Sequence, residues 1–200
     1  PQHGLIYSTS EFADKIKRAA FPGMMSNHHL HNVAGLAVVL AEFMEFGKPY
    51  CTQIMKNAKA LAQSLHERGW EVIAEHKGFT ESHVVLVDVT ETPMDDGHQV
   101  EKELEKANIV INRNLLPWDK KRGRDYRRPG GIRLGTSEMT RLGMKESEMD
   151  GIAELMTRVV MKGESVEKVA EDVAEFRRDF QHVQYAYDTE TPAYKHLRFM

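Results

Sequence analysis

Arg133 stands in a short apolar segment bracketed by glycines, residues 130–136, which reads GGIRLGT. A solvated charge is out of place in such a segment, so we expect the arginine to be buried against an anion. The glycines leave room for a small ligand, and the guanidinium fork suits a bidentate grip on a carboxylate. The segment predicts the binding end of a site. The alternative is an ion pair with a local acid such as Asp125 or Glu138.

The elements that must position this arginine are a mixture of strands and helices. Apolar residues at helical spacing predict helices over 11–20, 30–45, 49–68, 99–107 and two more after residue 151, while 4–8, 70–74, 83–89, 109–111 and 132–135 are expected to be strands. The helix over 30–45 is expected to be buried. We therefore predict an α+β fold in which helices cover a small antiparallel sheet.

Composition limits the kinds of protein that this chain can be. Of its 200 residues, 41% are hydrophobic and 28% are charged, which is typical of a globular chain. The longest apolar run, 33–40, is too short to span a bilayer, so no membrane partner is expected. A single cysteine fits a reducing compartment, and a cytoplasmic location is the default. The net charge of -3 gives no general attraction to nucleic acid.

Three histidines lie close together in the loop before residue 32, at positions 28, 29 and 31. Neither a cysteine nor a carboxylate completes a ligand set with them, and the spacing matches no standard zinc pattern. We predict no metal site.

Five stretches carry a resemblance to a known family. They are Phe21-Pro22-Gly23, the histidine loop ending HHLH at 28–31, NAKALA at 57–62, NRN at 112–114 and GIRLGT at 131–136. In this order they resemble serine hydroxymethyltransferases, and the details SNHHLH and GFTESH resemble the archaeal-type members.

The resemblance implies a fold-type I transferase of one-carbon metabolism that uses pyridoxal 5'-phosphate. Such an enzyme moves a hydroxymethyl carbon between serine and a tetrahydropterin carrier, tetrahydrofolate or tetrahydromethanopterin, and makes glycine. It implies further that Arg133 grips the substrate carboxylate and that Asn114 and Phe21 lie near the pterin. A turn asparagine and plain packing are the alternative roles of these last two residues.

The loop over 24–29 resembles the loop that contacts the cofactor phosphate and reaches the neighbouring subunit of a homodimer. Many family members carry two glycines where this chain has Ser26 and Asn27. Side chains that can donate hydrogen bonds to phosphate oxygens therefore replace bare backbone, and we predict Ser26 and Asn27 as cofactor-binding residues.

The resemblance also implies a division of the chain. Residues 1–45 are expected to be the end of a large cofactor-binding domain, and residues 46–200 the C-terminal small domain. In the family, the lysine that forms the Schiff base lies just before the position of Pro1, so this chain is expected to be the C-terminal half of an enzyme and inactive alone. The alternatives are an aldolase of β-hydroxy amino acids that uses the same cofactor and a non-catalytic relic for binding or dimerisation.

Six basic residues in nine, over 120–128, form a local cluster. It has three interpretations: a solvated loop, an attractor for an anionic cosubstrate that bears glutamates or phosphate, and a nucleic-acid surface. The last is disfavoured because Asp119 and Asp125 dilute the cluster and no recognition fold accompanies it.

Overall fold

The computed structural model describes residues 4–193. The chain forms two compact units, Pro1–Gly47 and Lys48–Met200, and a long helix, α2 (Leu30–Glu67), contributes residues to both. The predicted boundary between 45 and 46 lies close to this division. That the first unit belongs to a larger cofactor domain remains a prediction.

The first unit is helical and exposes much apolar surface. It holds α1 (Ser10–Arg18), the π-helical turn η1 (Ala19–Met24) and the start of α2, whereas the predicted strand over 4–8 is irregular, because no partner strand lies beside it in the described chain. Leu30 and Met44 are 69% and 90% exposed. The prediction that the helix over 30–45 is buried is therefore wrong for the described chain, because no other element of the unit packs over these side chains.

Helix α2 replaces the two helices that the sequence predicts. It runs through Pro49, although the missing N–H of the proline removes one intrahelical hydrogen bond. The helix continues because apolar residues keep their helical spacing on both sides of the proline. By length and composition alone, α2 is also the one helix in residues 4–193 that could cross a bilayer. This is a weak indication, since core helices of soluble proteins meet the same criteria.

The second unit is built on a four-stranded antiparallel sheet. The strands are β1 (Glu71–Val72), β2 (Val84–Asp88), β3 (Asn112–Asn114) and β4 (Gly131–Gly135), and their order in the sheet is β1-β2-β4-β3. Strand β4 is the centre of this arrangement because it pairs along its whole length with β2 and along part of it with β3. The predicted strand over 109–111 is wrong by a few residues: Ile109 and Ile111 pack against the core from an irregular segment, and pairing begins at Asn112.

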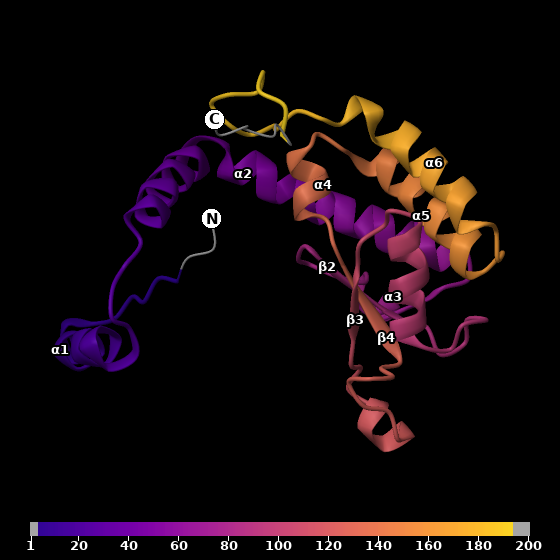
Figure 1. Cartoon of the computed structure of the whole chain (residues 1–200), viewed down its shortest axis with the longest axis horizontal. Helices are drawn as coiled ribbons and strands as arrows, with labels where there is room; N and C mark the ends of the chain where they lie inside the picture. Colours follow the sequence, from indigo (N-terminus) through magenta and orange to yellow (C-terminus); the bar gives the residue numbers. More distant parts are fainter. Residues whose placement is uncertain (1–3, 194–200) are drawn as a thin grey trace, which may run out of the picture. The chain divides into compact units, whose positions relative to one another are not determined.

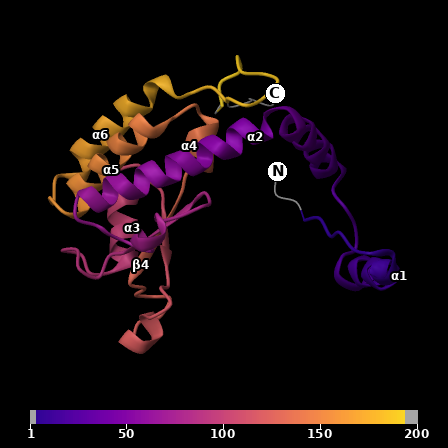
Figure 2. The same cartoon turned by 180° about the vertical axis from the view of Figure 1, so that it is seen from behind.

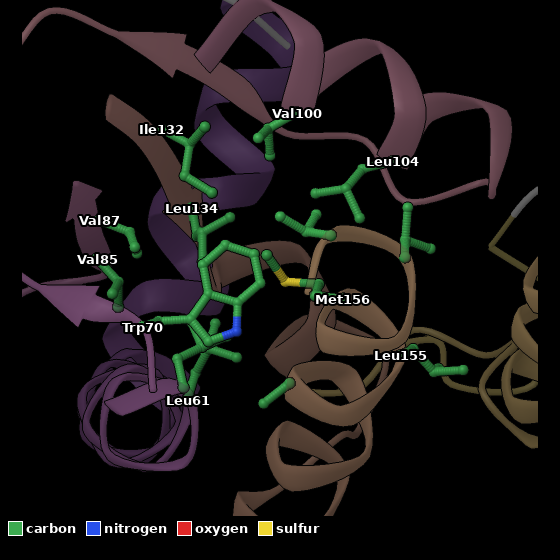
Figure 3. Close-up of a cluster of buried hydrophobic side chains, with 14 of the residues drawn as sticks. Leu61, Trp70, Val85, Val87, Val100, Leu104, Ile132, Leu134, Leu155 and Met156 are labelled. Carbon is green, nitrogen blue, oxygen red and sulfur yellow. The ribbon is translucent and has the colours of Figure 1, made fainter. Parts of the chain in front are cut away.

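One face of the sheet packs against helices. Figure 3 shows side chains of β2 and β4 meeting those of α2, α3 (Gly97–Lys106) and α5 (Glu146–Val160) around Trp70. The Trp70 side chain is 1% exposed, and its indole Nε1 donates a hydrogen bond to Thr157 Oγ1 at 2.9 Å. The indole therefore fills the centre of the core and also satisfies its one polar atom there.

Two further helices, α4 (Ser137–Arg141) and α6 (Val166–Phe176), complete the second unit. Helix α4 follows β4 directly, and α6 packs on α5, as Figures 1 and 2 show from opposite sides. The contact is close, since a Cβ at Gly151 would lie 2.8 Å from Phe176 Cε2. Gly163 separates the two helices with φ +62, the left-handed conformation that glycine favours. The predicted α+β class, a small antiparallel sheet covered by helices, is confirmed.

Replacing Trp70 with alanine should lower the free energy of unfolding by about 3 to 5 kcal/mol, because the change leaves a large cavity and removes the indole hydrogen bond to Thr157, whose hydroxyl keeps its bond to the Ala153 carbonyl. Urea unfolding followed by far-UV circular dichroism measures the loss. The control is Val110→Ala at a side chain that is 83% exposed, which should change the value by no more than about 0.5 kcal/mol. Equal losses in the two variants would contradict this account of the core.

Candidate functional site

Arg133 lies on the face of the sheet opposite the helices. From Ile132 to Gly135 the burial of strand β4 alternates, so that Ile132 and Leu134 enter the core and Arg133 points the other way and is exposed. The prediction that Arg133 is buried is therefore wrong. The apolar neighbours in sequence belong to the opposite face of the strand, and they do not surround the arginine.

The guanidinium of Arg133 has no carboxylate partner among residues 4–193, so the alternative of an ion pair with Asp125 or Glu138 is wrong. Its neighbours across the sheet are the apolar Leu86 on β2 and the neutral Asn112 on β3. A Cβ built at Gly135, two residues along the same face, would meet nothing within 4 Å. The arginine thus offers an uncompensated charge on a face with open space beside it.

Two asparagines of β3 share this face with Arg133. Asn112 is directly opposite Arg133 in the register, and Asn114 is opposite Gly131, which makes it a diagonal neighbour of the arginine. The Asn114 amide nitrogen donates to the carbonyl of Leu115 at 2.7 Å, and no described residue donates to its amide oxygen. The structure therefore brings the predicted Arg133 and Asn114 together, and it adds Asn112, which the alternation of the sequence NRN could have indicated.

The loop between β3 and β4 is closed by a buried carboxylate. Asp119 is 0% exposed, and its Oδ2 accepts hydrogen bonds from the backbone N–H groups of Leu116 at 2.9 Å and Gly130 at 2.8 Å. Glycine is required at position 130, because a Cβ there would lie 2.5 Å from Asp119 Oδ1. Since these two amides stand at opposite ends of the loop, Asp119 fixes where β3 ends and β4 begins.

A second carboxylate, Asp88 at the end of β2, holds the same loop from the sheet. It accepts hydrogen bonds from Thr90 Oγ1 at 2.6 Å, from Trp118 Nε1 at 3.1 Å and from Arg122 Nη1 at 3.0 Å. Burial raises the pKa of Asp88, but the hydrogen bonds from Thr90 and Trp118 and the charge of Arg122 outweigh it, and the pKa lies below its usual value. Sequence reasoning missed both Asp88 and Asp119, because a carboxylate that bonds to a distant segment leaves no local pattern.

The other predicted site residues lie in the first unit. Phe21 is 58% exposed in the π-helical turn η1. Ser26 and Asn27 are exposed in the irregular segment that precedes α2, where Asn27 Oδ1 accepts a hydrogen bond from the N–H of His28 at 2.8 Å. The side-chain amide nitrogen of Asn27 therefore stays available as a donor. The pterin role of Phe21 and the phosphate role of Ser26 and Asn27 stay predictions.

The histidine loop shows no metal geometry. The rings of His29 and His31 lie 5.6 Å apart, and within residues 4–193 no group of three or more histidine, cysteine, aspartate or glutamate side chains is placed to hold a metal ion.

Comparison with solved structures defines the class of protein. The chain superposes with a TM-score of 0.73 and 32% identity on L-threonine transaldolase from Pseudomonas fluorescens, solved in its internal aldimine state, over 84% of this chain and 37% of that one. The small antiparallel sheet with its helices is thus part of the fold of fold-type I pyridoxal-phosphate enzymes.

Comparison of sequences then gives the family. The family model described as serine hydroxymethyltransferase matches residues 6–156. Proteins named serine hydroxymethyltransferase from Korarchaeum cryptofilum and Methanocaldococcus jannaschii are each 53% identical to this chain, over 98% and 100% of its length. The chain belongs to the serine hydroxymethyltransferase family, which confirms the resemblance that the five motifs indicate. It spans 45% and 46% of the length of these two relatives.

Because the pKa of Asp88 is lower in the folded chain than in the unfolded one, its stabilisation is complete above the unfolded value and disappears as the pH falls through the folded value. Asp88→Asn should therefore be less stable than the unchanged chain at pH about 7, and the gap should narrow below pH about 4. Urea unfolding at a series of pH values measures it. An exposed control, Asp179→Asn, should stay within about 0.5 kcal/mol of the unchanged chain at neutral pH. A gap of constant size at all pH values would show that the Asp88 charge does not hold the loop.

Proposed function

We propose that this chain is part of a pyridoxal-phosphate-dependent serine hydroxymethyltransferase, which interconverts serine and glycine with a tetrahydropterin carrier. The single observation that supports it is the unpaired Arg133 on the open face of the sheet, in a chain of this family. An arginine without a local acid, beside a glycine with open space, can accept the carboxylate of a small amino acid through two parallel hydrogen bonds.

The neighbouring asparagines complete the polar part of this face. The free amide oxygen of Asn114 can accept a hydrogen bond, and the Asn112 amide can both donate and accept. A pterin ring carries both N–H donors and carbonyl or ring-nitrogen acceptors, so it can form hydrogen bonds with these amide groups. We propose that Asn114 binds the pterin and that the carrier is tetrahydrofolate or tetrahydromethanopterin. A pterin role of Phe21 is a separate proposal, which rests on the resemblance alone.

Two of the described residues suit the phosphate of the cofactor. When bound, pyridoxal phosphate stabilises negative charge that develops at the α-carbon of an amino acid. Ser26 and Asn27 carry exposed donors that suit its phosphate, but the four strands of the sheet contain no lysine. We propose that the lysine comes from another part of the complete protein, and that the 200-residue chain is inactive alone.

A second candidate is an aldolase of β-hydroxy amino acids, and it is favoured by the likeness to a threonine transaldolase. Its substrates carry the same α-carboxylate, so Arg133 would serve both reactions. The two candidates differ in the acceptor, because only the hydroxymethyltransferase needs the tetrahydropterin. The non-catalytic relic, a module for binding or dimerisation, is the third alternative.

The setting of the complete protein is also part of the proposal. We expect a cytoplasmic homodimer that acts on serine and glycine, with neither a membrane nor a nucleic acid as partner. The net charge of -3 and the single cysteine, Cys51, support this expectation.

A hybrid enzyme tests the proposed function. In the Methanocaldococcus jannaschii relative, the stretch that matches is replaced by this chain, which is possible because the match covers 100% of it. The hybrid should convert serine to glycine only when a tetrahydropterin is present. Cleavage of threonine-type amino acids without pterin, at a higher rate than serine conversion, would favour the aldolase instead, and inactivity of a folded, cofactor-bound hybrid in both assays would favour the relic.

The isolated chain gives an independent prediction. Mixed with pyridoxal phosphate, the 200-residue chain should show no absorbance of a Schiff base that borohydride fixes onto one particular lysine. Peptide mapping after reduction checks this, with the hybrid as the positive control. A single lysine of this chain that is labelled as completely as in the hybrid would overturn the proposal that the lysine lies elsewhere.

In the hybrid, Arg133→Ala should lower kcat/KM for serine by about 30-fold to about 1,000-fold, which corresponds to the loss of a charge-assisted bidentate contact. Cofactor absorbance should stay unchanged, because the arginine is assigned to the substrate. The matched control is Arg178→Ala, at an exposed arginine that pairs with Glu175 outside the sheet. An unchanged kcat/KM in the Arg133 variant would remove this residue from the site.

A further inference from the structure

A polar pocket, separate from the face that carries Arg133, lies in the loop that joins β3 to β4. It has a volume of about 460 Å³, and four arginines, two aspartates and Gly123 line it. Figures 1 and 2 show this loop, with its turn η3 (Asp119–Arg122), standing out beyond the end of the sheet. The loop itself is held from below by Asp88 and Asp119, so the pocket is built on a fixed base.

Arg124 forms one wall of the pocket. Its side chain is only 18% exposed, and Nη1 donates to the carbonyl oxygen of Asp95 at 2.9 Å while Nη2 pairs with the carboxylate of the same residue. The N–H of Arg124 also donates to the carbonyl of Asp119 at 2.9 Å. Arg124 is therefore a brace of the wall, and it neutralises the charge of Asp95.

Arg122 and Arg128 each use a small part of their hydrogen-bonding capacity on the protein. Arg122 gives Nη1 to Asp88 at 3.0 Å, and Arg128 gives Nε to Asp96 at 3.1 Å, yet the two side chains are 49% and 71% exposed. A guanidinium has five N–H donors, so most donors of both arginines remain open to solvent. The internal acids orient these side chains without occupying them.

Arg127 has no carboxylate partner among residues 4–193. Its guanidinium lies 5.6 Å from the centre of the Tyr126 ring, with Nε 3.3 Å from the tyrosine hydroxyl. The nearby Asp125 is engaged, because its Oδ1 accepts hydrogen bonds from the backbone N–H groups of Arg127 at 2.8 Å and Arg128 at 3.4 Å. Arg127 therefore keeps most of its donors for solvent, although the four acids at this pocket, Asp88, Asp95, Asp96 and Asp125, balance the formal charge of its four arginines.

We propose that this pocket binds a compact oxyanion with two or more negative charges, as a phosphate monoester or a group of adjacent carboxylates provides. Three arginines with spare donors around one pocket can donate to several oxygens at once. A monocarboxylate has only two oxygens and cannot engage all three arginines. The aspartates between the arginines argue against a long nucleic-acid surface, which needs an unbroken basic stripe. The proposal does not depend on the proposed function.

The 200-residue chain itself can test the proposal. Inorganic phosphate and a tetraglutamate peptide are titrated separately into the ¹⁵N-labelled chain at constant ionic strength, because screening changes the affinity of exposed charges. Saturable shifts of the amides of Gly123, Arg127 and Arg128 are expected with at least one probe. Saturation by phosphate alone identifies a phosphate-type ligand, and saturation by the peptide alone a carboxylate-type ligand.

Two double variants with the same change in charge separate a site from general attraction. Arg127→Gln with Arg128→Gln should raise the Kd at least about tenfold. Lys120→Gln with Lys121→Gln, at exposed lysines of the same loop that do not line the pocket, should raise it less than about threefold. The unshifted amides of α5 report that each variant is folded. No saturable shift with either probe, or equal weakening by the two double variants, would overturn the proposal.

Discussion

The pairing of β4 with both of its neighbours is the constraint on which the rest of the second unit depends. Because side chains alternate along a strand, the register that sends Ile132 and Leu134 into the core also sends Arg133 to the open face. A shift by one residue would bury the arginine among apolar side chains and expose the core residues. The hydrophobic effect that fixes the core thus fixes the position of the charge as well.

The loop between β3 and β4 depends on buried carboxylates in a comparable way. Asp119 joins both ends of the loop through backbone N–H groups, and Asp88 reaches its middle through Trp118 and Arg122. A loop of this length would be mobile if it were held only by the strands at its two ends. With these contacts, Asn114 at one end and Arg133 near the other are held on the same face.

Apolar spacing and glycine positions act over a few residues, and they predicted the fold class and most of the helices. The resemblance of five short motifs indicated the family. They failed where distant residues decide the outcome. The apolar residues next to Arg133 in the sequence suggest that its side chain is buried. Only the pairing of β4 with Leu86 and Asn112 shows that the side chain lies on the open face. A proline inside a helical pattern usually ends the helix, yet α2 continues through Pro49.

The candidate site was predicted in the same uneven way. Arg133 and Asn114 were singled out from motifs, whereas Asp88 and Asp119 were not, because each also bonds to a distant segment: Asp88 to Trp118 and Arg122, and Asp119 to Gly130. Asn112 was missed although it stands in the same motif as Asn114. Its position directly opposite the arginine is set by the register of the sheet.

The arginines of the sheet and of the loop differ in how their charge is compensated, and this difference separates what they can bind. Arg133 has no acid beside it and one guanidinium, which suits the single carboxylate of a small molecule. The loop arginines are oriented by Asp88, Asp95 and Asp96, and these acids lower the net charge, so a weakly charged ligand gains little there. Only an anion with several charges can engage enough of the remaining donors to outweigh the acids. The two proposed sites, on neighbouring parts of one β3–β4 unit, thus favour different anions, a monocarboxylate and a multivalent anion, without sharing a residue.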